Sequence, residues 1–403
     1  MYGDWFTLND EDRYLATLYQ RFPINIARGK GATVWDIAGK EYIDCMGGYG
    51  VALVGHCNDR VVDAIKRQAE LLITAHMSTY NDTRLRFMEK IASVAPTSLN
   101  KIFFANSGAE SVEAALKFAR KYSGKHGVIG MNGAYHGKTF GALSVTYNEK
   151  YRKSFVPLLD GVKFVPYSDP SLLEEAIDDT IGTVILEPIQ GETGIIVPPD
   201  NLLPKIREIC DRRNLVLVFD EIQSGLGRTG KMWAGQNWNT TPDIMCLAKG
   251  IAGGIPMGLV LAKQEIMDSM KLGEHSSTFG GSPIACAAGI ATMEALIDDK
   301  LVENAAQMGL RFREGLSRLK EKHKIIREVR GIGMMIGVEL RFDVKDILFD
   351  GIRRGLLLLY SGRNILRLLP PLVMNEVTIS RVVDIMDIIL TEEEKRRNVS
   401  KYG

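Results

Sequence analysis

Between about residue 100 and residue 250, short apolar segments alternate with amphipathic ones. The apolar segments are continuous and do not alternate with polar residues, which is typical of strands buried on both faces. Such strands form a mainly parallel sheet covered by helices, an α/β architecture whose ligands bind beyond the carboxyl ends of the strands. The predicted strands are residues 101–105, 127–131, 162–166, 182–187, 215–220 and 244–248.

The two ends of the chain are organised differently. Strands are predicted at 33–36 and 41–44, followed by a loop at 47–50 and a helix near 59–73. Beyond residue 290 we expect a long helix, strands at 334–340 and 364–368 and a final helix. This pattern predicts a large domain over residues 50–290 and a smaller α+β domain formed by residues 1–49 together with residues 291–403.

Lys249 ends the apolar segment 244–248, and a glycine-rich segment follows it at once. An amine with apolar neighbours loses hydration of its charged form, so its pKa falls and it becomes a usable nucleophile. Lysines that form Schiff bases need this property, and nearby glycines let a flat ring approach the backbone. The alternative is a lysine at a strand end without a chemical role.

Acidic residues follow two predicted strands. Glu187 and Glu192 lie at and just beyond the end of segment 182–187, where they face solvent or, in a cleft, pair with a substrate amine or an arginine. Asp220 ends the most apolar segment, where an unpaired carboxylate would be costly. Asp220 is therefore either the partner of a pyridinium nitrogen in a bound cofactor or the aspartate of a nucleotide site.

Two loops could hold a phosphate. Ser107 and Glu110 have the spacing of a capping box, which indicates either a well-capped helix or a helix whose free N–H groups bind phosphate, with Gly108 allowing close approach. The second loop, residues 132–139, ends in Gly137-Lys138-Thr139 but has Asn132 where a P-loop needs glycine. Tyr135 in this loop could stack on a planar ligand or simply pack.

Arg367 interrupts the apolar segment 364–372 near the end of the chain. It could reach solvent from an edge strand, and an arginine fork is also the natural receptor for a substrate carboxylate.

Charge and cysteine content exclude several classes of protein. The net charge of +1 gives no support for nucleic-acid or bulk membrane binding. The five cysteines form no CxxC pair, which indicates reduced thiols and no metal site. The first residues lack the pattern of a signal peptide, and no apolar run approaches membrane-spanning length, so we expect a cytoplasmic protein.

These motifs, in this order, resemble the class III pyridoxal-phosphate-dependent aminotransferases over nearly the whole chain. The most specific match is residues 219–230, Phe-Asp-Glu-Ile-Gln-Ser-Gly-Leu-Gly-Arg-Thr-Gly, followed by Lys249. The resemblance implies fold type I, with a mainly parallel seven-stranded sheet in the large domain, and pyridoxal 5'-phosphate as the cofactor.

The resemblance also implies roles for individual residues. Lys249 would form the Schiff base with the cofactor and move the proton, and Asp220 would pair with the pyridinium nitrogen. Gln223 would lie near the ring hydroxyl and Tyr135 against the ring face. The remaining implied cofactor contacts are Glu221 and Ile222 beside Asp220, then Ser107, Gly108 and Ala109 at the phosphate, joined by Thr278 of the partner subunit in a homodimer.

Within the class, the chain is similar to acetylornithine and carrier-protein-linked lysine or ornithine aminotransferases. Arg367 would then bind the α-carboxylate of glutamate or 2-oxoglutarate, and Glu192 would cover that arginine while the diamine reacts. Lys138, Ser277 and Tyr49 complete the implied substrate site. Residues 141–152 are most similar to the lysine and arginine biosynthetic branch that uses a small acidic amino-group carrier protein.

Four positions bear on the identity of the substrate. Acetylornithine enzymes usually have phenylalanine and arginine where this chain has Tyr135 and Lys138. Tyr49 matches the free-ornithine enzymes, whereas Thr33 stands where those enzymes have a second tyrosine. Together these positions favour a protected diamine as the substrate.

Several alternatives remain open on the sequence. One is a free ornithine or 4-aminobutyrate aminotransferase, and another is a P-loop nucleotide-binding protein that uses Lys138 and Asp220. The basic residues around Tyr151, which are Lys150, Arg152 and Lys153, form either a docking surface for an acidic carrier protein or a solvated loop.

Overall fold

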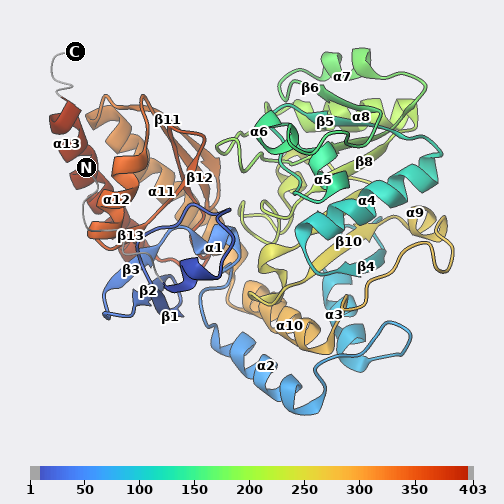
Figure 1. Cartoon of the computed structure of the whole chain (residues 1–403), viewed down its shortest axis with the longest axis horizontal. Coiled ribbons are helices and arrows are strands. Elements are labelled where there is room, and N and C mark those ends of the chain that lie inside the picture. The colour runs from blue at the N-terminus through green and yellow to red at the C-terminus, as the bar shows by residue number, and fades with distance from the viewer. Residues whose placement is uncertain (1–9, 398–403) are drawn as a thin grey trace.

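A seven-stranded sheet forms the centre of the larger half of the molecule, as the computed structural model of residues 10–397 shows (Figure 1). Strand β10 runs antiparallel to both of its neighbours, and the other neighbouring pairs are parallel. In sheet order the strands are β4 (Lys101–Ala105), β10 (Gly258–Ala262), β9 (Ile244–Leu247), β8 (Val216–Asp220), β7 (Ile181–Leu186), β5 (Gly127–Met131) and β6 (Val162–Val165).

The six predicted strands of this sheet are all present, with ends that differ by no more than one residue. The seventh strand, β10, had no individual prediction, because it begins at a glycine that follows a glycine-rich segment. A Cβ atom at Gly258 would lie 2.3 Å from the Ser107 carbonyl oxygen, so glycine allows β10 to pass close to the start of helix α4 (Gly108–Ser123).

Both faces of the sheet are buried, as the continuous apolar segments predicted. Val218, Cys246 and Val260 pack with helix α4 on one face. Their neighbours Leu217 and Phe219 pack with helix α8 (Leu202–Arg213) on the opposite face. Shorter or peripheral helices on this half are α3 (Asp82–Ala92), α5 (Phe140–Ser144), α6 (Glu149–Arg152), α7 (Pro170–Ala176), α9 (Gln264–Asp268) and the 3-10 turns η2 (Ala234–Trp238) and η3 (Lys249–Ala252).

Two smaller sheets lie in the other half. One has the order β1 (Ile26–Lys30), β2 (Thr33–Asp36), β3 (Glu41–Asp44) and β13 (Leu356–Leu357), so the N-terminal strands join a strand from the C-terminal part of the chain. The other has the order β11 (Ile326–Ile332), β12 (Met335–Leu340), β15 (Ile365–Leu368) and β14 (Leu359–Ser361). Strands β1, β11, β13 and β14 had no prediction, and the domain boundaries themselves stay a prediction. Residues 1–9 and 398–403 of the predicted small domain lie outside the described residues.

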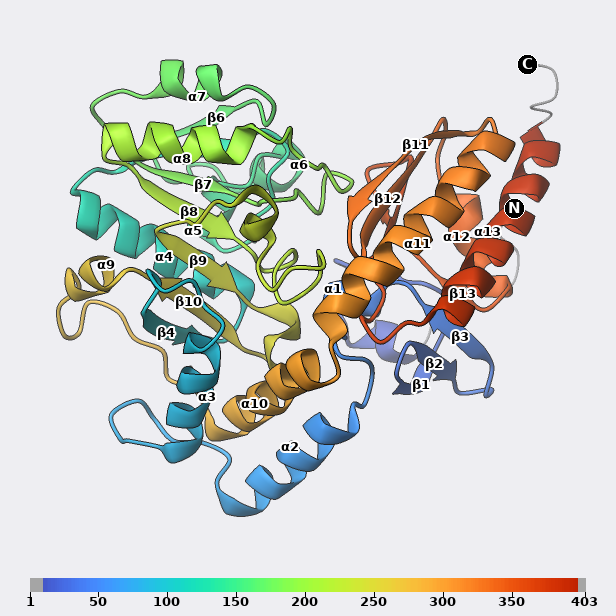
Figure 2. The same cartoon turned by 180° about the vertical axis from the view of Figure 1, so that it is seen from behind.

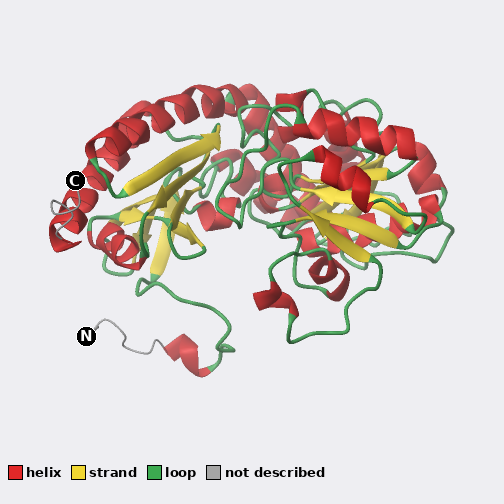
Figure 3. Cartoon of the chain, turned by 90° about the horizontal axis from the view of Figure 1, so that it is seen from above, coloured by secondary structure: helices red, strands yellow, loops and turns green. Residues whose placement is uncertain are grey.

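Helices connect and cover the two halves. Helix α10 (Pro283–Asp298) packs against α2 (Asp59–Leu71) and α3, and α11 (Leu301–Lys322) follows it and packs on β11 (Figure 2). Helices α12 (Lys345–Arg353) and α13 (Glu376–Arg397) complete the smaller half, and the 3-10 turn η1 (Asp10–Arg13) precedes β1. The view from above shows the strands in two separate groups, each with helices around it (Figure 3). The predicted loop at 47–50 is a single turn, α1 (Gly47–Gly50), in which Gly48 and Tyr49 have left-handed φ angles.

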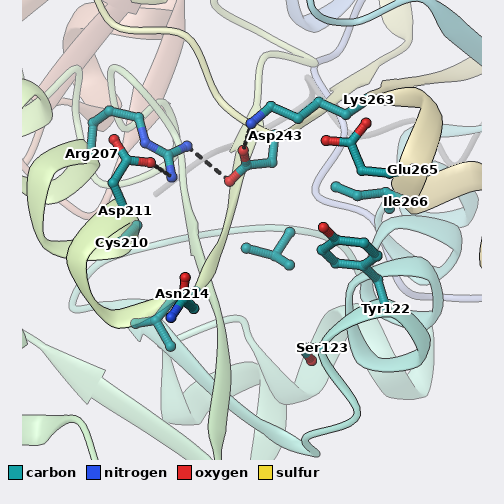
Figure 4. A pocket seen from close by; sticks show the side chains of 12 residues that line it. Tyr122, Ser123, Arg207, Cys210, Asp211, Asn214, Asp243, Lys263, Glu265 and Ile266 are labelled. Atoms are coloured by element: carbon teal, nitrogen blue, oxygen red, sulfur yellow. Dashed lines mark hydrogen bonds and ion pairs between the residues drawn. The ribbon is translucent and has the colours of Figure 1, made fainter.

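Asp243 joins β8, β9 and β10 at the end of the large sheet where β8 and β9 begin. Its carboxylate accepts a hydrogen bond from the Leu217 backbone N–H at 2.7 Å. It also accepts one from Arg207 at 2.8 Å and pairs with Lys263 at 2.6 Å (Figure 4). The hollow in Figure 4 lies at the opposite ends of these strands from Asp220 and Lys249. We therefore assign the Asp243 cluster to the stability of the sheet.

The substitution Asp243→Asn should lower the melting temperature by about 3 to 6 °C, because it leaves two cations beside a buried neutral group. Differential scanning calorimetry measures this change. The control is Glu208→Gln, which removes exposed ion pairs with Lys205 and Arg212 and should change the melting temperature by less than about 1 °C. Equal effects of the two substitutions would contradict the assignment.

Candidate functional site

A cavity of about 520 Å³ opens at the carboxyl ends of the central strands. Its size is within the range of small-molecule sites. The predicted site residues that line it come from the ends of β4, β5, β7, β8 and β9, and they are Ser107, Gly108, Ala109, Tyr135, Lys138, Glu192, Asp220, Ile222, Gln223 and Lys249.

Lys249 begins the turn directly after β9 and has a left-handed φ of 51°. This conformation is strained for a residue with a side chain, so the surrounding fold must hold it in place. Burial lowers the pKa of Lys249, and the nearby charges of Glu192 and Asp220 oppose that change without cancelling it. The Lys249 amine has no hydrogen-bond partner within residues 10–397, so it is available to react.

Asp220 is the last residue of β8 and is almost fully buried. Its Oδ2 atom lies 2.7 Å from Nδ1 of His136, and its Oδ1 accepts a hydrogen bond from the Ile222 N–H at 3.1 Å. A buried carboxylate needs such partners. His136 also lines the cavity, and no role was predicted for it although it lies between Tyr135 and Lys138.

Helix α4 points its N-terminus at the cavity. Ser107 caps it by accepting a hydrogen bond from the Glu110 N–H at 3.2 Å, and the first intrahelical bond is Ser111 N–H to the Ser107 carbonyl. The N–H groups of Gly108 and Ala109 come before that bond, so they stay available to a ligand. A helix N-terminus of this kind favours an anion such as phosphate.

The segment after β8 separates into residues that face the cavity and one that does not. Ile222 and Gln223 line the cavity, and Gln223 Oε1 is buried without a hydrogen-bond partner in the described part of the chain. Glu221, expected to contact the cofactor, accepts hydrogen bonds from the N–H groups of Ala234 and Gly235 instead. The Glu221 side chain therefore does not line the cavity, because successive side chains at a strand end point in opposite directions, and its contact with the cofactor stays a prediction.

Tyr135 and Lys138 lie on the loop that follows β5. The Tyr135 ring packs edge-on against Tyr151, with the centroids 5.8 Å apart. The Lys138 ammonium lies 4.9 Å from the centre of the Tyr151 ring, and Glu187 accepts a hydrogen bond from the Tyr135 N–H. Burial raises the pKa of Glu187 to about 7. Tyr151 thus connects the predicted ring-facing tyrosine with the predicted substrate lysine.

Arg367 reaches the site from the smaller half of the molecule. It is fully buried in β15, and its Nη1 donates to Glu192 Oε1 at 2.6 Å. Its Nε and Nη2 atoms have no partner within the described residues. The Tyr49 ring lies 5.7 Å from the guanidinium carbon, so these three predicted substrate residues are brought together.

Five predicted residues do not line the cavity: Glu221, Tyr49 and Arg367, whose contacts are given above, and Ser277 and Thr278. Ser277 lies beside it and accepts a hydrogen bond from the Asn106 side chain at 3.1 Å. Thr278 is exposed on the surface, and its predicted place in a partner subunit's site stays a prediction.

The residues present fit pyridoxal phosphate. The α4 N-terminus suits its phosphate, Asp220 its pyridinium nitrogen, and the unpartnered Gln223 Oε1 its ring hydroxyl. Lys249 would supply the amine that binds the aldehyde. No group of three potential metal ligands occurs within residues 10–397, and no helix in that range is long and apolar enough to cross a membrane.

Comparison with known proteins agrees with this arrangement. The family model for class-III aminotransferases matches residues 14–390. The chain is 42% identical over 389 residues to the acetylornithine aminotransferase of Caldanaerobacter subterraneus subsp. tengcongensis, covering 95% of this chain and 98% of the relative. It is 41% identical over 402 residues to the acetylornithine aminotransferase of Methanocaldococcus jannaschii, covering 97% and 99% of the two chains.

Solved structures give the same result for the fold. The ornithine aminotransferase of Toxoplasma gondii superimposes with a TM-score of 0.92 at 33% identity, covering 96% of this chain and 94% of that one. The acetylornithine aminotransferase of Elizabethkingia anophelis superimposes with a TM-score of 0.85 at 33% identity, covering 95% and 97%.

Asp220→Asn should reduce turnover about a hundredfold, because the site loses the charge that faces the cofactor's ring nitrogen. Glu221→Gln should affect stability and leave turnover nearly unchanged. It should lower the melting temperature by removing one acceptor from two buried N–H groups, while turnover changes by less than about threefold. Single-turnover kinetics and calorimetry on both variants test this pair. A loss of turnover larger than about threefold in Glu221→Gln would indicate that Glu221 contacts the cofactor.

Proposed function

Because the chain belongs to the class III aminotransferases and uses pyridoxal phosphate, we propose that it exchanges the distal amino group of a protected diamine with 2-oxoglutarate and glutamate. The protected diamine is N-acetylornithine, or lysine or ornithine linked to a small acidic amino-group carrier protein. The reaction would be a cytoplasmic step of arginine or lysine biosynthesis.

The ion pair between Glu192 and Arg367 is the observation that carries this proposal. Arg367 is fully buried, and Glu192 occupies only one of its three nitrogens. When the Glu192 side chain turns away, the guanidinium can bind a carboxylate in the bidentate manner that suits an amino acid. When Glu192 covers it, the cavity can accept a reacting amine that has no adjacent carboxylate. Two substrates of different charge can therefore use one site in turn.

The residues around the cofactor support the exchange chemistry. Pyridoxal phosphate, when bound, supplies an electron sink for the electrons released when the substrate loses a proton. Lys249, with its lowered pKa, is placed to take that proton and return it. Asp220 keeps a negative charge at the ring nitrogen, and the first N–H groups of α4 orient the phosphate.

Lys138 supports a substrate that carries a carboxylate at the end remote from the reacting amine. It is exposed at the rim of the cavity and is held over the Tyr151 ring. A lysine there offers a point charge to a carboxylate on the distant end of the diamine, where the fork of an arginine would offer two parallel hydrogen bonds. The names of the relatives favour N-acetylornithine among the protected diamines.

Free ornithine is the second candidate. Tyr49 lies beside Arg367, and a solved structure with a TM-score of 0.92 is an ornithine aminotransferase. Reaction with free ornithine, which has no protecting group, would distinguish this candidate from the first.

The basic segment around Tyr151 is smaller than its sequence suggested. Arg152 lies over the Phe164 ring at 4.9 Å and is half-buried, and Lys138 lies over Tyr151. Lys150 and Lys153 are exposed and form no ion pair within residues 10–397. These two lysines are the groups that we propose contact an acidic carrier protein.

A homodimer is part of the proposal. Large apolar side chains are exposed on and after α2 and near Thr278, which is typical of a surface that binds another subunit. They are Leu71, Leu72, Ile73, Met77, Tyr80 and Phe279.

Arg367→Lys should reduce kcat/KM for glutamate about a hundredfold, because lysine cannot make the bidentate contact. It should reduce kcat/KM for the protected diamine by less than about fivefold. Each half-reaction is followed from the absorbance of the bound cofactor with N-acetylornithine, carrier-linked lysine, carrier-linked ornithine, free ornithine and 4-aminobutyrate in turn. Rapid reaction of free ornithine in the wild type would replace the first candidate by the second.

Lys150→Glu combined with Lys153→Glu should reduce kcat/KM for a carrier-linked amine at least about tenfold at low salt and leave N-acetylornithine turnover unchanged. The control is Lys205→Glu, because Lys205 is an exposed lysine on α8 that does not line the cavity. Equal effects of the double substitution on both amines would contradict the docking surface.

A further inference from the structure

Glu187 is a buried carboxylate that the roles above do not use. It follows β7 directly and lies beside Asp220, because Leu186 pairs with Phe219 in the neighbouring strand. It lines the cavity, and only 6% of its surface is exposed. A carboxylate at this depth is costly unless its oxygens accept hydrogen bonds, so its partners indicate what it does.

Two backbone N–H groups from different loops bind the two oxygens of Glu187. Oε1 accepts from the Tyr135 N–H at 3.0 Å, and Oε2 accepts from the Gly191 N–H at 2.9 Å. Tyr135 carries the aromatic ring at the cavity, and Gly191 directly precedes Glu192, which covers Arg367. One carboxylate therefore holds the backbone next to two side chains that the reaction needs.

The segment from Glu187 to Glu192 is also held at both of its ends. The Tyr167 hydroxyl donates to the Glu187 carbonyl at 2.7 Å, and the Ser361 hydroxyl donates to the Glu192 carbonyl at 2.6 Å. With its backbone held, Glu192 can uncover Arg367 by rotating its side chain while the loop stays in place. Because Gly191 directly precedes Glu192, the hydrogen bond to its N–H fixes the backbone position from which the Glu192 side chain extends.

Other contacts fasten the same two loops without reaching the cavity. The Gln190 side chain donates to the Asn132 carbonyl at 2.8 Å, and the Thr193 hydroxyl donates to the Gly133 carbonyl. Asn132 and Gly133 do not line the cavity. Thr193 provides a comparison for Glu187, because it joins the same loops and also adjoins Glu192 but contacts neither the Tyr135 nor the Gly191 N–H.

We propose that Glu187 is a positioning residue that places the Tyr135 ring and the Glu192 carboxylate through these two N–H groups. It thereby sets the selectivity of the site between a substrate with an α-carboxylate and a substrate that presents a distal amine. The proposal goes beyond the identity of the diamine, although one of its two measurements rests on the proposed function.

Glu187→Gln is the informative substitution. A glutamine oxygen can accept one of the two N–H groups, but its NH₂ group faces the other donor. The variant therefore keeps the size of the side chain and breaks one of the two links. Thr193→Val is the control, because it removes one link between the loops and leaves both Glu187 contacts in place.

The first measurement is amide hydrogen exchange on the full-length holoenzyme. Glu187→Gln should exchange about tenfold faster in residues 132–138 and 188–194 than the wild type, because a broken link exposes these amides. The second measurement is the ratio of kcat/KM for glutamate to kcat/KM for the amine that the wild type accepts. A less firmly held Glu192 leaves Arg367 uncovered, so the ratio should rise about tenfold in Glu187→Gln and change less than about twofold in Thr193→Val.

Unchanged exchange in both segments would overturn the proposal, whichever amine is the substrate. Faster exchange with an unchanged ratio would also overturn it, because Glu187 would then only fasten the loops. A wild type that reacts with free ornithine and not with N-acetylornithine would contradict the proposed function alone, since the ratio is then measured with ornithine. If Glu187→Gln does not yield folded, cofactor-loaded protein, Glu187→Asp is measured with the same expectations, because its shorter carboxylate cannot reach both donors.

Discussion

The site depends on charges that the fold removes from water and then pairs incompletely. Asp220 is buried at the end of β8 and has His136 and one backbone N–H as partners. Lys249 is held near it with a lowered pKa and no hydrogen-bond partner within residues 10–397. Burial of an incompletely paired charge is unfavourable, and a bound cofactor would provide the missing partners.

The same reasoning separates two buried arginines. Arg228 and Arg367 both have guanidinium nitrogens without partners in the described part of the chain. Arg228 donates to the carbonyl groups of Met334 and Pro370, and burial lowers its pKa to about 9. It therefore joins the loop after β8 to the smaller half of the molecule. Arg367 instead donates to the Glu192 carboxylate at the cavity, and in the proposed function its remaining nitrogens receive a substrate when Glu192 rotates away.

The large sheet could be predicted closely because strands buried on both faces have continuous apolar sequences. Strand β10 was missed because Gly258 begins it, and the reason for that glycine is the nearby Ser107 carbonyl, a contact between distant parts of the chain. Strands β13 and β14 are too short to carry a periodic pattern, and each is defined by its pairing with β3 or β15. Glu221 shows what the sequence left open at the site, because only the folded structure shows that its side chain accepts from the N–H groups of Ala234 and Gly235.

By itself, the sequence determined the family, the cofactor and half of the residues that line the cavity, because the motifs around Asp220 and Lys249 depend on local order along the chain. Tertiary structure alone decided which charges meet. It brought Arg367 from β15 to Glu192, set His136 behind Asp220, and placed the Glu187 carboxylate between the backbones of Tyr135 and Gly191. These contacts join residues far apart in sequence, and their strength comes from a low-dielectric interior that exists only after the sheets have packed.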